Sequence, residues 1–272
     1  MNLKAQDSLN YKKPLNNKQK LVIAGIAAQQ AGSFYIEYNW WWKNNYHPFN
    51  LKNDGGFNNY SLGIDKVGHF YVSYLYYHAI HEIMTYGEFS KRTINTTSVL
   101  LPALWALSIE IGDGFSRYAF NPDDLVANFL GITYGLAQHN IKWLEPFNFK
   151  MSYIPSKKFI DNKFKGWALS DDYDGHIYWL TANLHQINSS TFNAALFKYF
   201  NIGVGYGIDN FNADKIGREF FVGLDYNLSA VNTKNKKVLT AFKNIADKWH
   251  FPAPGIKTNL IDNTKFKTLI LN

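Results

Sequence analysis

Cysteine is absent from the 272-residue sequence. This absence excludes disulfide bonds, thiolate metal sites and a cysteine nucleophile, and it leaves these residues without a cysteine for a lipid anchor. Charged residues are also scarce: they make up 18% of the chain, against roughly 25% in ordinary soluble domains. The net charge is +7, but the lysines are scattered and the arginines are only Arg92, Arg117 and Arg218. We therefore expect no nucleic acid among its partners.

Several common catalytic motifs are absent too. The sequence has no G-x-G-x-x-G, P-loop, G-x-S-x-G or H-E-x-x-H pattern, so it lacks the usual signs of dinucleotide binding, P-loop NTPases, serine hydrolases and zinc proteases. His78 and His81 lie three residues apart in a helical pattern without a matched partner, so we interpret them as structural. The acidic cluster at 171–176 lacks EF-hand spacing and indicates a solvated turn.

Aromatic residues are abundant instead, at 17% of the chain. Together with the few charges they indicate large apolar surfaces, and we expect a membrane surface or other envelope proteins as partners. Trp40–Trp42, beside Lys43, suits a membrane interface and equally a buried aromatic anchor. Leu3–Ser8 looks like the end of an export signal, with Ala5 before the cleavage point, or else like a plain polar tail. We hypothesise an exported protein of the periplasm or outer membrane of a Gram-negative bacterium, with inner-membrane association as the alternative.

Four stretches without any charged side chain predict four helices: Leu21–Ile36, Val67–His81, Thr93–Ile109 and Leu125–Ile141. All four are shorter than the roughly 18 apolar residues of a confident membrane span, so we favour a bundle that touches a membrane over helices embedded in one. Asn121 followed by Pro122 predicts the start of the fourth helix, because asparagine caps helices and proline suits their first turn. Gly112 and Gly114 predict the end of the third helix.

After Pro155 the apolar pattern changes from a helical to an alternating one. Residues 200–208 and 220–228 alternate apolar side chains with mostly glycine or polar ones, which predicts two strands around the polar loop Asp209–Gly217. Further candidate strands are Ile177–His185 and Thr191–Tyr199. Lys236–Trp249 has one apolar stripe opposite lysines, which predicts an amphipathic helix. We expect the sheet to pack on the helices, because four strands cannot close a membrane barrel.

The expected fold class is therefore α+β: an N-terminal bundle of about four apolar helices, followed by a small antiparallel β-sheet and a C-terminal amphipathic helix. We expect the helical bundle to occupy residues 1–150 and the β-rich region, with its C-terminal helix, residues 151–272. The sequence does not predict an oligomeric state.

Polar residues gather at the ends of the predicted helices, and these ends meet if neighbouring helices run antiparallel. The start of the second helix, the end of the third and the start of the fourth would then lie at one level. Glu110 is the most demanding residue, because a carboxylate in a last helical turn opposes the helix dipole and needs a partner when buried. The candidate polar site consists of nine residues: Asp65, Lys66, His69, Glu110, Asp113, Ser116, Arg117, Asp124 and Asn128.

The order of these residues resembles that of a known family. Asp65-Lys66-Val67-Gly68-His69-Phe70, then Glu110 with Asp113, Gly114-Phe115-Ser116, and Asp124 with Asn128 and Gly131 form the series DK..HF, E..D, GFS, D...N..G. This series, within residues 61–135, resembles the YfiM-like family of predicted periplasmic lipoproteins, a family of unknown function, and more loosely VanZ-like membrane proteins. The resemblance implies an envelope-associated helical domain without an established activity, in which these residues form the shared site.

Two functions fit the candidate site. In the first, the chain is a structural or interaction module of the cell envelope, and its charged residues form a buried polar network that fixes the helices. In the second, it is a metal-assisted hydrolase or transferase that acts on an envelope lipid or glycan precursor. The candidate ligands of a divalent metal are Asp65, His69, Glu110, Asp113 and Asp124. Lys66 and Arg117 would then neutralise developing negative charge.

Overall fold

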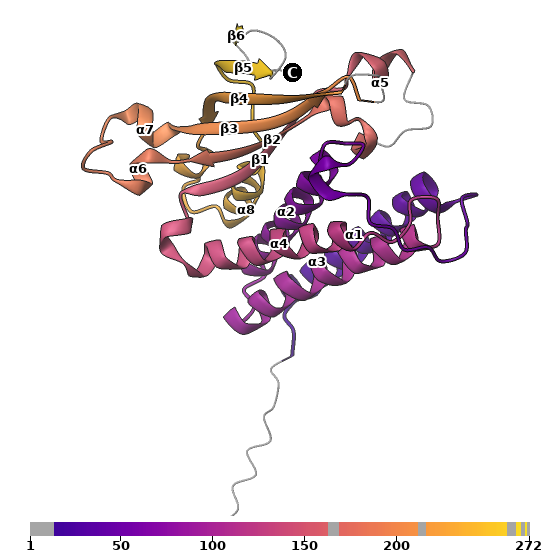
Figure 1. Ribbon diagram of the computed structural model, residues 1–272. Coiled ribbons are helices and arrows are strands. Elements are labelled where there is room, and N and C mark those ends of the chain that lie inside the picture. Colours follow the sequence, from indigo (N-terminus) through magenta and orange to yellow (C-terminus); the bar gives the residue numbers. More distant parts are fainter. Residues whose placement is uncertain (1–13, 163–168, 212–215, 260–264, 268–269, 271–272) are drawn as a thin grey trace, which may run out of the picture.

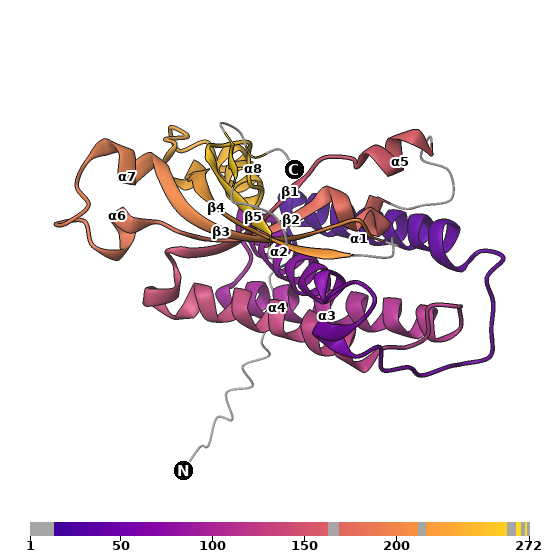
Figure 2. The ribbon, with the colours of Figure 1, turned by 45° about the horizontal axis from the view of Figure 1, so that its top comes forward.

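The computed structural model describes residues 14–162, 169–211, 216–259, 265–267 and 270. The chain forms two layers: four long helices make up one, and an antiparallel sheet lies across them (Figures 1 and 2). This is the predicted α+β fold class, with the helical region first in the chain and the sheet second.

The four uncharged stretches all form helices. Their bounds are α1 Asn17–Glu37, α2 Ile64–Tyr86, α3 Lys91–Gly114 and α4 Pro122–Asn140. Two predicted boundaries are confirmed: the Asn121 side chain caps α4 by accepting a hydrogen bond from the backbone N–H of Asp123, and α3 ends at Gly114. The helices extend beyond their uncharged stretches, so charged side chains gather at helix ends.

Helix α2 packs against both α3 and α4. Its approach to α4 is close at Gly131, where an added Cβ would collide with the carbonyl oxygen of Phe70 on α2. Gly135, one turn further along α4, faces the ring of Tyr77 in the same way. The two backbones therefore come near enough for the Ser73 hydroxyl to donate a hydrogen bond of 2.7 Å to Asn128. Gly131, the glycine of the D...N..G series, therefore allows α4 to pack closely on α2.

The sheet has six antiparallel strands, and each strand pairs with the next along the chain. Their bounds are β1 Phe147–Tyr153, β2 His176–Ala182, β3 Phe200–Asp209, β4 Gly217–Tyr226, β5 Gly255–Asn259 and β6 Lys265–Lys267. The two alternating segments are confirmed as β3 and β4. Gly205 of β3 lies opposite Trp179 of β2, where an added Cβ would come within 2.9 Å of the indole ring. The glycines of β3 therefore make room for a tryptophan.

Two strand predictions need correction. Thr191–Tyr199 is not a strand, and its second half forms the short helix α7, Ala195–Tyr199. Ile177–His185 is a strand only in its first part, as β2, and then continues into the short helix α6, Leu184–Ile187. Asn183 caps α6 by accepting a hydrogen bond from a backbone N–H, so the chain leaves the sheet there. A short apolar alternation does not by itself separate a strand from a one-turn helix.

The predicted amphipathic helix is confirmed as α8, Lys237–Ala246, which packs against α2. The segment after α8 runs beside β1: the Met151 N–H donates to the Lys248 carbonyl, and the His250 N–H donates to the Met151 carbonyl. The shorter elements are the π-helical turn Tyr38–Trp42, the helix α5 Lys157–Asp161 and the 3-10 turns Gly56–Asn58, Lys142–Leu144, Leu169–Asp171, Tyr173–Gly175 and Leu228–Ala230.

The sheet packs on the bundle through aromatic side chains. Tyr178 of β2 and Ile208 of β3 join Ile64, Tyr71 and Tyr74 of α2 in one buried cluster. Full burial of such a side chain stabilises the fold by roughly 1.5–3 kcal/mol. The sheet and the bundle therefore share a core, with α2 at the contact.

A lysine is enclosed where the sheet meets the segment after α8. Lys150 of β1 has no exposed surface, and its Nζ lies 2.7 Å from Asp225 of β4 and 3.1 Å from Asp247. The ammonium also donates a hydrogen bond of 3.0 Å to the carbonyl of Tyr226. This buried ion group, which we call the Lys150 group, ties together three segments that are far apart in the chain.

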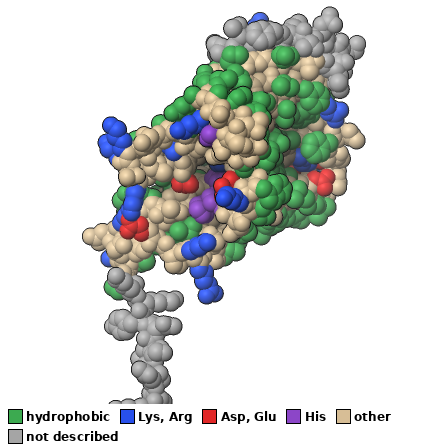
Figure 3. Space-filling view, turned by 90° about the vertical axis from the view of Figure 1, so that its left-hand side faces the viewer, with side chains coloured by type: hydrophobic (Ala, Val, Ile, Leu, Met, Phe, Trp, Pro, Cys, Tyr) green, Lys and Arg blue, Asp and Glu red, His purple; other side chains and the backbone are tan. Residues whose placement is uncertain are grey.

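Apolar side chains are exposed along the long helices. On α3, Leu100, Leu104 and Ile111 are exposed, and among the described residues α3 is the helix whose length and composition would allow it to cross a membrane, a property that core helices of soluble proteins share. Of the tryptophan cluster, Trp40 is exposed, whereas Trp42 packs against α3. Figure 3 shows hydrophobic side chains over much of one flank, beside a face that carries charged and histidine side chains.

Candidate functional site

The starts of α2 and α4 bring a lysine and three carboxylates together. The Nζ atom of Lys66 lies 2.8 Å from Asp54, 3.1 Å from Asp65 and 2.5 Å from Asp124. None of these four side chains is more than 13% exposed. Burial alone would lower the pKa of Lys66, but the charges of Asp124 and Asp65 outweigh it and raise that pKa. We call these four residues the Lys66 group, and its ammonium is charged at neutral pH.

The loop before α2 completes this group. The Ser61 hydroxyl donates a hydrogen bond of 2.5 Å to Asp65, and the Asn59 amide donates to Asp65 at 3.3 Å and to Asp54 at 2.8 Å. Asn59 also accepts hydrogen bonds from the Ser61 and Gly63 backbone N–H groups. The carboxylates of Asp54 and Asp65 are therefore held in place from two sides.

His69 lies one turn further along α2, between two carboxylates. Its Nε2 is 3.7 Å from Asp124 Oδ1, and its Nδ1 is 3.9 Å from Glu110 Oε1. The Asn128 amide lies 3.3 Å from Nδ1, and because the Asn128 oxygen accepts from Ser73, its nitrogen faces the ring. Nδ1 is then the acceptor, and Nε2 carries the proton of the neutral ring. We call His69, Glu110 and Asp124 the His69 cluster.

Glu110 is the least satisfied member of this cluster. Its side chain is 1% exposed; Oε2 accepts a hydrogen bond of 3.2 Å from the Asn121 N–H, whereas Oε1 has no hydrogen-bond partner among the described residues. Burial, and secondly the charge of Asp124, raise the pKa of Glu110 to about 8. A buried carboxyl group in this state takes up a proton or attracts a cation.

Asp113 adds a second perturbed acid close by, at the end of α3. Burial raises the pKa of Asp113 to about 7, although the indole N–H of Trp42 donates a hydrogen bond of 2.8 Å to its carboxylate. Burial also raises the pKa of Asp124, against the opposing effects of His69 and Lys66. Acids with pKa values near neutrality in one place are typical of functional sites.

A cavity of about 650 Å³ opens over these groups. The helices contribute Asp65, His69 and Asp124 to its lining, and the sheet side contributes aromatic residues such as Tyr178 and Trp249. This volume is within the range of pockets that bind small molecules, which combine apolar walls with a few polar groups. The polar cluster therefore faces a space large enough for a ligand.

Two of the nine predicted residues contact other groups than the cluster. Ser116 is buried in the loop after α3, where its hydroxyl donates to the Asp113 carbonyl and accepts from the Tyr118 N–H. The Arg117 guanidinium donates to the Tyr118 hydroxyl at 3.0 Å and is exposed at the cavity lining. Ser116 thus shapes the loop, and Arg117 provides a positive charge at the cavity that interacts with Tyr118 and with the charge of Asp171.

One carboxylate of the site, Asp54, and the aromatic wall of the cavity were not among the residues predicted from the sequence. Asp54 bonds Lys66 as closely as Asp65 does, and its signal was only an Asn- and Asp-rich loop before the second helix. The aromatic wall, which includes Tyr153 and Tyr173, comes from segments about 100 residues later in the chain. No local spacing connects these residues with α2, so only the packing of the sheet on the bundle reveals them.

The five predicted metal ligands separate into two sets. His69, Glu110 and Asp124 each offer one ligand atom, and these atoms lie within 4.8 Å of one another. Asp65 instead faces Lys66 and the loop, and Asp113 faces Trp42. One imidazole and two carboxylates suit Mn²⁺ or Zn²⁺, so the His69 cluster is the candidate cation site within the cavity.

Residues 54–139 match the model of DUF2279, a family described as predicted periplasmic lipoproteins. The match covers α2, α3 and α4 and therefore includes all nine residues of the candidate site. It confirms the resemblance drawn from the sequence series. No curated protein and no solved structure matches the chain.

Proposed function

We propose that this protein is a cell-envelope hydrolase or transferase that binds an amphiphilic, anionic molecule in the cavity and acts on it with the aid of a divalent cation held by the His69 cluster. The observation that carries the proposal is an incompletely satisfied histidine–carboxylate cluster, two members of which, His69 and Asp124, line a cavity of about 650 Å³. The proposed substrates are phosphorylated lipid or glycan precursors of the envelope.

The charge balance around the cavity supports a cation. Five acids lie at this end of the bundle, Asp54, Asp65, Glu110, Asp113 and Asp124. The cations are Lys66 and, when protonated, His69, with Lys52 and Arg117 at the cavity lining. A divalent ion between His69, Glu110 and Asp124 would offset the excess negative charge and would lower the pKa of Glu110, because a nearby cation favours the carboxylate form.

Such an ion would also make an acidic wall compatible with an anionic substrate. It would hold a phosphate or ester oxygen and lower the pKa of a water molecule beside it. His69 would coordinate the ion through Nδ1, the ring nitrogen that faces the Asn128 amide in this structure. Lys52 and Arg117 line the same cavity and would balance negative charge on the substrate.

The apolar half of the cavity supports an amphiphile. Its sheet side is lined by Met151, Tyr153, Tyr178, Phe211 and Trp249, which suit an alkyl chain or a prenyl group more than a free sugar. The exposed apolar side chains of α1, α3 and α4 fit a protein that works at a membrane surface or on an envelope partner. The envelope location is in keeping with the family's description as periplasmic.

A second function, a structural or interaction module, is supported by the Lys66 group alone. In that group every charged side chain has at least one ion-pair or hydrogen-bond partner, as expected of a network that only fixes helix geometry. The two proposals predict different behaviour of the His69 cluster, because a purely structural network needs neither a cation nor a ligand.

The test measures metal and ligand binding together. Protein purified without chelator is analysed for bound metal by mass spectrometry, and dodecyl phosphate is titrated calorimetrically with and without Mn²⁺ or Zn²⁺. Hydrolysis of p-nitrophenyl phosphate and p-nitrophenyl butyrate is measured under the same conditions. The informative variants are Glu110→Gln and His69→Gln, which keep side-chain size, and His47→Gln serves as control because His47 is exposed and outside the cavity lining.

We expect metal-dependent binding of dodecyl phosphate by wild type and His47→Gln, and a loss of roughly tenfold or more in both cavity variants. Hydrolysis of either ester would identify the reaction class. If wild type binds neither metal nor dodecyl phosphate, the enzymatic proposal is wrong and the structural one is supported. Circular dichroism of each variant separates a lost site from a lost fold.

A further inference from the structure

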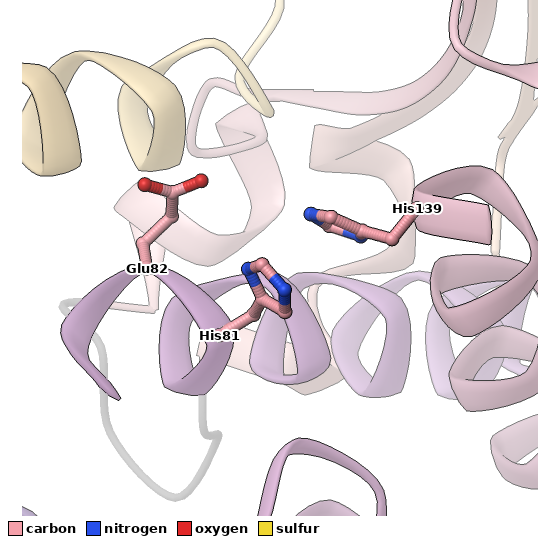
Figure 4. A group of neighbouring side chains, drawn as sticks. All are labelled: His81, Glu82 and His139. Carbon is pink, nitrogen blue, oxygen red and sulfur yellow. The ribbon is translucent and has the colours of Figure 1, made fainter. Parts of the chain in front are cut away.

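A second group of metal-ligating side chains lies at the other end of α2. His81 and Glu82 are on the last turns of α2, and His139 is on the last turn of α4. One ligand atom from each of the three lies within 4.8 Å of the others. Figure 4 shows the three side chains turned toward one another from the two helices. His81 is twelve residues beyond His69, so about 18 Å of helix separates this group from the His69 cluster.

The histidine rings are oriented for a ligand. His139 Nδ1 lies 3.1 Å from the Gly135 carbonyl, so Nδ1 carries the proton and Nε2 keeps its lone pair for a metal. His81 Nδ1 is buried and has no hydrogen-bond partner among the described residues. The His81 and His139 rings lie nearly face to face, with centroids 3.8 Å apart and planes at 35°. The two rings would have to turn edge-on for a single ion to meet a nitrogen of each.

Two lysines near Glu82 oppose a cation in this group. Glu82 accepts a hydrogen bond from Asn244 and interacts with Lys243 and Lys248. Lys248 is buried and its Nζ already donates to Tyr74 at 3.0 Å, so its charge is engaged with groups beside the site. A metal ion would have to share Glu82 with these lysines, which limits its affinity without removing the ligand.

We propose that His81, Glu82 and His139 form a Zn²⁺ site on the surface between α2, α4 and α8, separate from the cavity. Two histidines and one glutamate are a known zinc ligand set, which leaves the fourth position to water. Zinc at 2.0–2.1 Å from its ligands requires donor atoms about 3.3 Å apart, so the three side chains would close by an ångström or so on binding. The ion would join the ends of α2 and α4.

The test titrates the apo protein with Zn²⁺ and, for spectroscopy, with Co²⁺, whose visible absorption reports a tetrahedral histidine site. Three variants are compared with wild type: His139→Gln, His81→Gln and the exposed control His47→Gln. All are measured also in a Glu110→Gln background, so that metal bound in the cavity does not enter the result. His139 is at an exposed helix end, so its variant keeps the test valid if His81→Gln fails to fold.

We expect one Zn²⁺ per chain in the Glu110→Gln background, an intense visible Co²⁺ band, and a higher melting temperature with Zn²⁺. His139→Gln should weaken Zn²⁺ binding roughly tenfold or more and abolish the band, whereas His47→Gln should change neither. Absence of Zn²⁺ binding in the Glu110→Gln background would overturn the proposal. So would binding that His139→Gln and His81→Gln leave unchanged. Neither outcome depends on whether the cavity binds a substrate.

Discussion

Two buried lysines of this protein have similar partners and different surroundings. Lys150 and Lys66 each lie within 3.1 Å of more than one carboxylate. Lys150 is enclosed between β1, β4 and the segment after α8, and it is absent from the cavity lining among the described residues. Lys66 instead belongs to a group that shares Asp124 with His69, and Asp124 lines the cavity.

The difference separates an ion group that only stabilises the fold, the Lys150 group, from one that also adjoins the proposed site, the Lys66 group. The Lys150 group ties strands together, and the chain offers no space beside it for a ligand among the described cavity residues. The Lys66 group fixes one oxygen of Asp124, and in doing so it positions the carboxylate that His69 and Glu110 approach. A buried ion group therefore indicates a functional site only when unsatisfied acids and a cavity accompany it.

The largest expected effect is on the enclosed lysine. Lys150→Met leaves Asp225 and Asp247 buried without their cation, so we expect the free energy of unfolding to fall by about 3–5 kcal/mol in urea denaturation. Lys18→Met, which breaks an exposed pair with Glu88, should cost less than about 1 kcal/mol. Equal losses in the two variants would contradict the structural role of Lys150.

Lys66→Met should destabilise the protein by a smaller amount, about 2–3 kcal/mol, because cavity water and ions reach the carboxylates of its group. Mn²⁺ or Zn²⁺ should restore part of this loss, since a divalent cation can take the place of the ammonium beside Asp124. The same ions should leave the Lys150→Met loss unchanged. Denaturation of both variants with and without metal tests the comparison directly, and rescue of neither would remove the proposed difference.

The pH dependence of stability should reveal the acids beside Lys66. The unfolded chain releases the Glu110 proton near its ordinary value of 4.5, whereas the folded protein keeps it up to about pH 8. Stability should therefore fall as pH rises from about 4.5 to 8, by about 1.4 kcal/mol per pH unit from Glu110 alone, and Asp113, with a pKa raised to about 7, adds to this slope. Glu110→Gln should remove its own part of the slope in urea denaturation at several pH values. An unchanged slope would show that Glu110 is not the titrating group.

The smallest expected effect on stability is at Arg117. Its guanidinium is exposed and donates its hydrogen bond to the neighbouring Tyr118, so Arg117→Gln should change the free energy of unfolding by less than about 0.5 kcal/mol. Its charge at the cavity should matter for an anion, and the Kd for dodecyl phosphate should rise severalfold. A stability loss as large as that of Lys66→Met would place Arg117 in the structural group instead.

The helices and their ends were predictable because their signals are local. Uncharged runs define the bodies of α1 to α4, and Asn121 with Pro122 marks the start of α4. The convergence of Asp65, Glu110 and Asp124 followed from antiparallel packing alone. In contrast, the strand β1 was missed, because Lys150 interrupts its apolar pattern and only the distant Asp225 and Asp247 explain a lysine there.

The groups that sequence reasoning could not assemble are those whose members come from distant segments. His81 had no visible partner, because His139 is on another helix and meets it only through the close packing of α2 on α4 at Gly131 and Gly135. The prediction for Thr191–Tyr199 was wrong for a local reason, because its apolar spacing fits both a strand and a short helix. Long-range contact decides the first case, whereas the second segment ends in the one-turn helix α7, which begins without a side-chain cap.

The family match ends at residue 139, whereas the residues that line the cavity extend to Trp249. The His69 cluster and the Lys66 group come from the matched segment, and the sheet side of the cavity comes from residues 151–249. Under the proposed function, the cation site and most of the apolar wall are thus encoded in separate stretches of the chain. Under the same proposal, a chain that keeps residues 54–139 and carries another sheet would keep the cation site and bind a different molecule.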